Sequence, residues 1–511
     1  MQMQDIGQRL VFGFHGPVIP DSFRALVHEY KIGNVILFRH NVVNNSQLRM
    51  LCAEIQQLIM AETGHPAFIA IDQEGGMVSR LGEDAVAVPG NMAVAATGDP
   101  AGARTAAQIT SHQLRGLGIN MNLAPVLDVN SNAHNPVIGV RSYGDDPLCV
   151  ARFAREAVFG YADAGICCCG KHFPGHGDTA VDSHIGLPCV DKSLSDLERC
   201  ELIPFRAAIE AGIPAIMSSH ILFPKLEDSD IPSTMSRRIM HDLLREKLGF
   251  NGLVLSDCMA MDAIRRHYGA PQGALAAMNA GVDLVFVSSD EDLQRKTAAF
   301  LCESAQTDAL DSGEMQASLQ RILRFKAQYA YTDALPELVG QAQDAEASAR
   351  LHRCAVTHVG GVLFKPDAHT FFCGPEDYRV SLVGNSAAAI KAAPLLFESI
   401  YGGGAAVCSK NPDPAEIGRI VNQAAAYDKM MLFTCNGHLF SGQIALAKAL
   451  SALSKPMMIA ALRNPYDLAM LPDIGKIAVY DYSLSALHAL MDALNTNQFY
   501  GHLPIHPEES L

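Results

Sequence analysis

The sequence predicts an α/β protein: a (β/α)8 barrel of the TIM type, followed by a smaller α/β sandwich domain. Three observations lead to this prediction. Eight short apolar runs precede residue 290, segments with helical spacing separate most of them, and titratable side chains follow six of the runs. With 49% hydrophobic and 18% charged residues among 511, the chain has the composition of a globular protein with a large core.

Each of the eight runs has the length of a strand and is almost continuously apolar, which is typical of strands buried on both faces of a parallel sheet. In chain order they are RLVFGF (9–14), NVILF (34–38), AFIAID (67–72), INMNLAPVLDV (119–129), ICCCGKHF (166–173), PAIMSSH (214–220), GLVLSD (252–257) and VDLVFVS (282–288). Segments such as 46–62 and 99–118 have helical spacing. A doubly wound sheet is the structural alternative.

Polar side chains stand where these runs end. They are Arg39, His40, Asp72, Asp128, Lys171, His172, His220 and Asp257. In a barrel, the carboxyl ends of the strands meet on one face, where active sites of this fold lie. Polar residues also mark the exit of any strand, but their occurrence after six different strands favours a common site.

The pattern changes after residue 334. We expect a barrel domain over 1–334, a helical linker over 335–352 and a second domain over 353–511. Five further apolar runs, at 379–384, 405–409, 429–435, 456–462 and 476–482, predict a mostly parallel sheet with helices. The segment GNSAAAI (384–390) lacks the glycine spacing of a dinucleotide loop, so no nucleotide site is expected there.

Net charge and cysteine usage restrict the partners and the compartment. A formal net charge of −15 argues against nucleic acid or an anionic membrane surface, and favours a small neutral substrate. Neither a signal peptide nor a membrane-spanning stretch is visible. The 13 cysteines include the run 167–169, whose members point to opposite faces of a strand and are not expected to pair. We therefore expect reduced thiols and a cytoplasmic protein.

The loop KHFPGHGDTAVDSHIGLP (171–188) carries three histidines. These residues, His172, His176 and His184, have spacings that suggest metal ligands, but a proline and two glycines between them prevent a helical metal-binding face. We expect no metal site. In Asp182-Ser183-His184, the aspartate can fix the tautomer of the histidine and leave its other nitrogen free for proton transfer. A surface loop with an incidental histidine is the alternative.

Asp257 ends the run GLVLSD and would bring one carboxylate into the same site. A fixed carboxylate opposite a proton donor is what retaining glycoside hydrolysis requires, since one group attacks the anomeric carbon while the other protonates the leaving oxygen. The alternative is an aspartate that caps the following helix.

Six motifs in the same order resemble family 3 glycoside hydrolases, specifically their β-N-acetylhexosaminidase branch. They are IDQEGGMVSRL (71–81), APVLDVN (124–130), NPVIGVRSYG (135–144), the 171–188 loop, MSSHILFP (217–224) and GFNGLVLSDCMAMDAI (249–264). The segment ALRNPYDLAMLP (461–472) resembles the second domain of two-domain members. The sequence departs from the family at Met77 and Cys258, where many relatives carry arginine and aspartate, and it contains no tryptophan for sugar stacking.

The resemblance assigns roles to eight residues. It implies that Asp257 is the nucleophile and that His184, with Asp182 as its partner, is the acid/base. Asp72, Arg80, Arg141, Lys171 and His172 are implied to bind the sugar. His176 receives no role.

The implied protein is a cytoplasmic, retaining exo-β-N-acetylglucosaminidase acting on peptidoglycan fragments, with a carbohydrate as its partner and no cofactor. The oligomeric state is not predicted. Two alternatives are a phosphorylase with the same first step and a non-catalytic sugar-binding protein. β-Glucosidase or β-xylosidase activity is less favoured, because those relatives lack the Asp-Ser-His element.

Overall fold

Eight parallel strands pair in chain order and close into a barrel, because β8 also pairs with β1. The computed structural model describes residues 3–179, 186–288, 290–307, 309–378, 392–471 and 474–506. The barrel strands are β1 (Leu10–Phe12), β2 (Asn34–Leu37), β3 (Phe68–Ile71), β4 (Met121–Asn122), β5 (Cys167–Phe173), β6 (Ala215–Ser218), β7 (Leu253–Cys258) and β8 (Leu284–Val287). Each lies within one of the eight predicted apolar runs or overlaps it, so the predicted barrel is confirmed.

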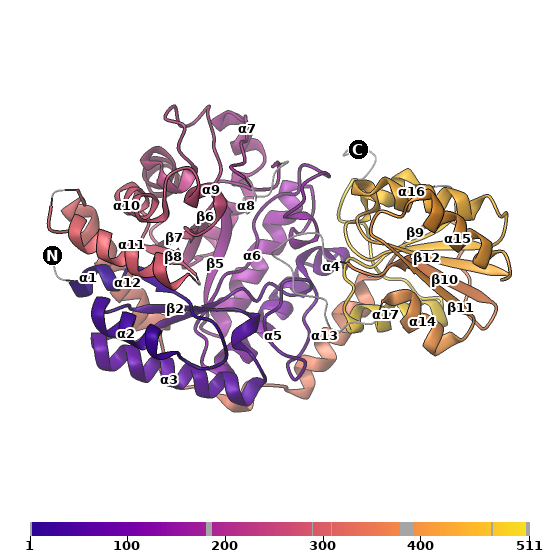
Figure 1. Cartoon of the computed structure of the whole chain (residues 1–511), viewed down its shortest axis with the longest axis horizontal. Coiled ribbons are helices and arrows are strands. Elements are labelled where there is room, and N and C mark those ends of the chain that lie inside the picture. Colours follow the sequence, from indigo (N-terminus) through magenta and orange to yellow (C-terminus); the bar gives the residue numbers. More distant parts are fainter. Residues whose placement is uncertain are drawn as a thin grey trace.

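Helices surround this barrel (Figure 1). They are α1 (Met3–Gly7), α2 (Asp21–Tyr30), α3 (Asn45–Thr63), α4 (Asn91–Ala96), α5 (Ala101–Leu117), α6 (Pro147–Asp163), α7 (Leu194–Arg199), α8 (Leu202–Glu210), the π-helix η4 (Arg238–Lys247), α9 (Asp262–Arg265), α10 (Ala270–Ala280), α11 (Glu291–Ser304) and α12 (Ser312–Tyr329). Short 3₁₀ turns are η1 (Arg39–Asn41), η2 (Gly139–Arg141), η3 (Ser233–Met235) and η5 (Pro336–Leu338).

Local signals explain where such helices begin and end. In α3, the side chain of Asn44 accepts a hydrogen bond from the backbone of Gln47, and Gly64 ends the helix in the left-handed conformation at φ 73°. A polar side chain that caps the first turn and a glycine after the last one are the expected helix boundaries.

The barrel interior is filled by alternate side chains of the strands. Cys167 and Cys169 of β5 belong to the interior cluster, whereas Cys168 packs with the residues between the barrel and its helices. The predicted alternation of the three cysteines is therefore confirmed, and it explains why adjacent thiols in this run face different environments.

The second domain is built on a six-stranded sheet with the order β11-β10-β12-β13-β14-β9. Its strands are β9 (Thr357–Gly360), β10 (Thr370–Pro375), β11 (Gly404–Cys408), β12 (Lys429–Thr434), β13 (Met457–Ala461) and β14 (Gly475–Ala478). Among the six described strands, β9 alone runs antiparallel to its neighbour, so a mostly parallel sheet is confirmed. Helices α15 (Pro414–Ala424) and α16 (Ser441–Ser451) cover one face, and α14 (Ala393–Tyr401) and α17 (Leu484–Thr496) cover the other (Figure 1). The 3₁₀ helices are η6 (Gly437–Leu439) and η7 (Pro465–Met470).

Strands β9 and β10 were not predicted. β10 combines an apolar run of only three residues with Gly374 and Pro375, which are residue types that are rare inside strands. β9 is an edge strand whose second half is partly exposed, so its sequence is not continuously apolar. The run expected at 379–384 lies outside the described residues, and the other four expected runs overlap β11 to β14.

Helix α13 (Ala342–Ala355) lies between the barrel and the second sheet and overlaps the segment 335–352 that was expected to be a helical linker (Figure 1). It packs against α4 and α5 on the barrel side and against α17 of the second domain. His112 and Asp344 form an ion pair of 2.9 Å across this contact. The division of the chain after residues 334 and 352 stays a prediction.

Among the helices that the structure describes, none is both long and apolar enough to cross a membrane.

Candidate active site

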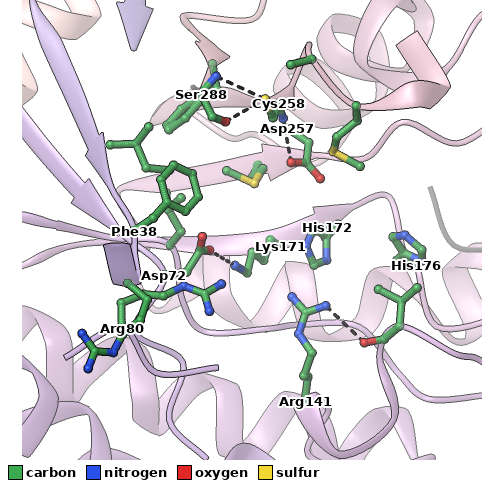
Figure 2. A pocket seen from close by; sticks show the side chains of 18 of the residues that line it. Phe38, Asp72, Arg80, Arg141, Lys171, His172, His176, Asp257, Cys258 and Ser288 are labelled. Carbon is green, nitrogen blue, oxygen red and sulfur yellow. Dashed lines mark hydrogen bonds and ion pairs between the residues drawn. The ribbon is translucent and has the colours of Figure 1, made fainter. Parts of the chain in front are cut away.

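A cavity of about 530 Å³ opens at the carboxyl ends of the barrel strands (Figure 2). Six of the eight predicted site residues line it: Asp72, Arg80, Arg141, Lys171, His172 and Asp257. They come from the segments after β3 and β4 and from the ends of β5 and β7. The barrel therefore brings together side chains that lie far apart in the sequence. The other two, Asp182 and His184, lie outside the described residues.

Three of the lining residues, Asp72, Arg141 and Lys171, belong to a buried network of ion pairs. The Lys171 ammonium lies 2.7 Å from a carboxylate oxygen of Asp72 and 2.7 Å from one of Glu74. The Arg141 guanidinium donates two hydrogen bonds of 2.8 Å to the two oxygens of Glu74. Glu74 thus lies between two cations and fixes the position of both, as bidentate arginine–carboxylate pairs do.

Electrostatics keeps this network ionised. Burial by itself would raise the pKa of Glu74, but the charges of Arg141 and Lys171 hold it well below its usual range. Burial would likewise lower the pKa of Lys171, yet Asp72 and Glu74 raise it above its ordinary value. Both groups are therefore charged at neutral pH.

A second group of contacts orients the histidines at the end of β5. Nδ1 of His172 lies 2.8 Å from a carboxylate oxygen of Asp128, which is buried and also accepts a hydrogen bond of 2.7 Å from the backbone N–H of His176. A histidine nitrogen held by a carboxylate leaves the other nitrogen to face the cavity. Burial opposes ionisation of Asp128, but the neighbouring His172 lowers the pKa of this carboxyl below its ordinary value.

His176, which received no role from the sequence, also lines the cavity. Its ring meets that of His172 edge to face at 5.5 Å, and its Nδ1 lies 2.8 Å from the hydroxyl of Thr179. Burial, and then the neighbouring His172, lower the pKa of His176 to about 4. His176 is therefore neutral near pH 7.

Asp257 lies near the end of β7, where it was expected. One of its carboxylate oxygens accepts a hydrogen bond of 2.7 Å from the backbone N–H of Cys258, and Figure 2 shows the carboxylate directed into the cavity. The Cys258 sulfur in turn lies 2.7 Å from the Ser288 hydroxyl. Burial raises the pKa of the Cys258 thiol, so this position carries no charge beside Asp257 at neutral pH.

Glu74 was not predicted as a site residue, and Asp128 was predicted only as a residue at the end of a strand. Glu74 stands two residues after Asp72 in IDQEGG, so the motif itself contained the signal. Its partner Arg141 is 67 positions away in the chain, and that pairing could not be read from the sequence.

The second domain supports the loop that ends in Arg141. The amide of Asn130 donates a hydrogen bond of 2.7 Å to the hydroxyl of Tyr466, and its oxygen accepts one of 3.0 Å from the backbone of Gly139. His438 lies 3.0 Å from the carbonyl oxygen of Ala133 through its Nε2.

The same loop supports the segment before residue 180. The amide of Asn135 donates to the carbonyl oxygens of His176 and Gly177, at 2.8 and 3.1 Å. The loop over 130–141 thus connects the second domain to the cavity, although all the lining residues that the structure describes precede residue 289.

The model of the glycosyl hydrolase family 3 N terminal domain matches residues 4–325, more than half of the chain. The chain belongs to glycosyl hydrolase family 3. The family resemblance found in the motifs is therefore confirmed, and with it the expectation of a glycoside hydrolase.

Several known proteins are similar to this chain over two thirds or more of its length. Beta-hexosaminidase A of Pseudoalteromonas piscicida is 35% identical over 367 residues, which are 67% of this chain and 61% of that protein. The chain thus spans less than two thirds of the length of that relative. A beta-hexosaminidase of Thiobacillus denitrificans is 32% identical over 375 residues, which are 72% of this chain and 98% of that protein.

A solved structure, a family 3 beta-N-acetylglucosaminidase from Paenibacillus sp. str. FPU-7, covers 99% of both chains with a TM-score of 0.91 and 35% identity. The match therefore extends over both domains of the present chain.

Proposed function

We propose that the protein is a retaining exo-β-N-acetylglucosaminidase that releases terminal β-linked N-acetylglucosamine, with peptidoglycan fragments as its substrates and the cytoplasm as its compartment. One observation carries the proposal: Asp257 lines one cavity together with Asp72, Arg141, Lys171 and His172, at the carboxyl ends of the barrel strands. Relatives named beta-hexosaminidase and beta-N-acetylglucosaminidase support the choice of sugar.

The reaction has two steps in this proposal. In the first, the Asp257 carboxylate attacks the anomeric carbon while the bond to the leaving oxygen breaks, and that oxygen takes a proton from His184. Asp182 orients His184 and stabilises its protonated form. In the second step, His184 takes a proton from water, whose oxygen attacks the anomeric carbon and releases Asp257. The product keeps the β-configuration, because two displacements occur at one carbon.

The remaining residues position the sugar. Asp72, Arg80 and Arg141 present a carboxylate and two guanidinium groups to vicinal hydroxyls and the acetamido group, and Lys171 and His172 complete the binding site. The ion pairs of Lys171 with Asp72 and Glu74 keep these groups in place before substrate binds. Such preorganisation supplies much of the catalytic effect in enzymes, since little has to move during the reaction.

The nucleophile is tested with Asp257→Ala and, as a matched control, Asp191→Ala at an exposed position. On an aryl N-acetyl-β-glucosaminide we expect Asp257→Ala to lower kcat by about 10³-fold or more, because the covalent step is lost. Added azide should restore turnover and yield the α-glycosyl azide, since a single displacement then occurs. Near-normal turnover of Asp257→Ala would refute the assignment.

The sugar and the acceptor are tested with a panel of aryl glycosides, N-acetylglucosaminide against glucoside, assayed with and without phosphate. Free N-acetylglucosamine in both conditions supports the proposal. Sugar 1-phosphate would instead identify a phosphorylase. Binding of sugar without turnover of any glycoside would identify a non-catalytic protein. Release of N-acetylglucosamine from peptidoglycan disaccharides, and recovery of the protein in the cytoplasmic fraction, test the remaining parts.

A further inference from the structure

The loop that follows β3 carries two residues of the cavity, one near each of its ends. Asp72 comes directly after β3, Arg80 lies further along the loop, and both line the cavity (Figure 2). Residues 72–80 are all described and contain neither a helix nor a strand. The position of Arg80 relative to Asp72 therefore depends on contacts that the loop makes through its side chains and turns.

The first half of this loop is held from outside. The carboxylates of Asp72 and Glu74 belong to the buried network of ion pairs. Between them, the backbone N–H of Gln73 donates to the side-chain oxygen of Asn122 at 3.0 Å, and the backbone carbonyl oxygen of Gln73 accepts from the Asn122 amide at 2.9 Å. Asn122 ends β4 and is fully buried. These bonds fix the backbone of Gln73 without involving its side chain.

The tip of the loop closes on itself. The backbone N–H groups of Glu74 and Gly75 donate to the carbonyl oxygen of Val78, at 3.0 and 3.1 Å, and the N–H of Val78 donates back to Gly75 at 3.2 Å. This turn ends before Ser79. The backbone that carries Arg80 thus follows a closed turn and needs a further contact to be fixed.

The side chain of Gln73 supplies that contact. Its oxygen accepts hydrogen bonds from the backbone N–H groups of Arg80 and Leu81, at 2.8 and 3.3 Å, and its amide donates to the hydroxyl of Ser79 at 2.8 Å. The side chain is almost completely buried, with an exposed fraction of 2%. One glutamine therefore holds three consecutive residues, and the middle one lines the cavity.

We propose that Gln73 is a positioning residue of the active site, whose side chain fixes the backbone of Arg80 so that the guanidinium group is held against the sugar. The inference rests on the proposed function, in which Arg80 binds the sugar. A glutamine suits this role, because its oxygen can accept two hydrogen bonds while its amide donates. Buried backbone donors that lose their acceptor are costly to leave unpaired, so without this oxygen the segment moves to find another partner.

The test compares two buried glutamines that bond to backbone groups. Gln73→Met keeps the length of the side chain but removes the oxygen that Arg80 and Leu81 share. The matched control is Gln56→Met, because Gln56 is also buried and exchanges two hydrogen bonds with the backbone of Ala67, at 2.9 and 3.0 Å. Ala67 precedes β3, at the end of the strand opposite to the cavity.

We expect both variants to lower the Tm, since each leaves buried backbone groups unpaired. Gln73→Met alone should also lower kcat/KM for an aryl N-acetyl-β-glucosaminide, by about 10- to 100-fold, as a displacement of about 1 Å in a positioned group does. An unchanged kcat/KM in Gln73→Met, or an equal fall in Gln56→Met, overturns the inference.

A double-mutant cycle with Arg80→Ala tests whether Gln73 acts through Arg80. Adding Gln73→Met to Arg80→Ala should change kcat/KM by less than about twofold, because the group that Gln73 positions is already absent. If the two losses multiply instead, Gln73 does not act through Arg80 and the inference is overturned.

Gln73→Asn provides a second variant with the same expected outcomes if Gln73→Met does not fold. It keeps a buried amide, but it is one methylene shorter and so withdraws the oxygen from the two backbone N–H groups. Wild-type inactivity on the N-acetylglucosaminide overturns the proposed function. An active wild type whose variants show multiplying losses overturns the inference on Gln73 alone.

Discussion

Replacing Glu74 by glutamine removes the charge that lies between two buried cations. The carboxylate accepts two hydrogen bonds from Arg141 and lies 2.7 Å from Lys171, and all three side chains are almost fully buried. Lys171 keeps its pair with Asp72, but Arg141 loses its carboxylate partner. Removing one partner of a buried ion pair costs about 3–5 kcal/mol, because the remaining charge is left uncompensated.

The effect on catalysis follows from the same contacts. Arg141 and Lys171 both line the cavity. In Glu74→Gln they face a neutral amide in place of the carboxylate that they contact in the wild type. A displacement of about 1 Å at such positions can cost about 10²-fold in rate. We expect kcat/KM for an aryl N-acetylglucosaminide to fall by roughly that factor, and the Tm to fall by about 5 °C or more.

Thermal unfolding and steady-state kinetics measure both effects, with Glu83→Gln as the control at an exposed glutamate. The pH dependence gives a further check. The pKa of Glu74 is far below its unfolded value, so its stabilisation is complete above about pH 5 and is lost progressively on acidification. The difference between wild type and Glu74→Gln should therefore shrink below pH 4. An unchanged Tm together with an unchanged kcat/KM would refute this account of the network.

Three further predictions concern residues outside this network. Asp128→Asn should lower kcat/KM by about 10- to 100-fold, because His172 loses a charge-assisted hydrogen bond; an unchanged pH–rate profile and rate would contradict this. Tyr466→Phe should raise KM about fivefold with little change in kcat, because the 2.7 Å bond to Asn130 is lost, and equilibrium unfolding should show a loss of about 1 kcal/mol. Burial lowers the pKa of Lys326 to about 7, so wild-type stability should rise between pH 7 and 10, and this rise should be absent in Lys326→Met.

Most of the fold could be predicted because the spacing of the apolar residues, and the residues at which strands and helices end, were visible in the sequence. The eight barrel runs are nearly continuous in apolar residues, and the segments between them have helical spacing. The second sheet was predicted less completely. β10 is buried, but its apolar part is short and is followed by a glycine and a proline. Its burial results from its position between the neighbouring strands β11 and β12 and not from its own composition.

The cavity could be predicted from residues at strand ends, because barrel topology brings such ends together. The ion pairs could not, since they depend on side-chain positions across loops of unknown shape. Glu74 stands in the same motif as Asp72, but only the structure places it against Arg141. The same holds for Asp128, which the sequence offered as one of several aspartates that follow strands.

The loop over 130–141 has a consequence for domain exchange within the family. Its contacts with Tyr466 and His438 mean that a side chain facing the cavity, Arg141, is held from outside its own barrel. A chimera that pairs this barrel with a foreign second domain therefore has to preserve both partners of each contact. Without them, the transplanted barrel is expected to keep its strands and helices but to bind its sugar in a loosened cavity.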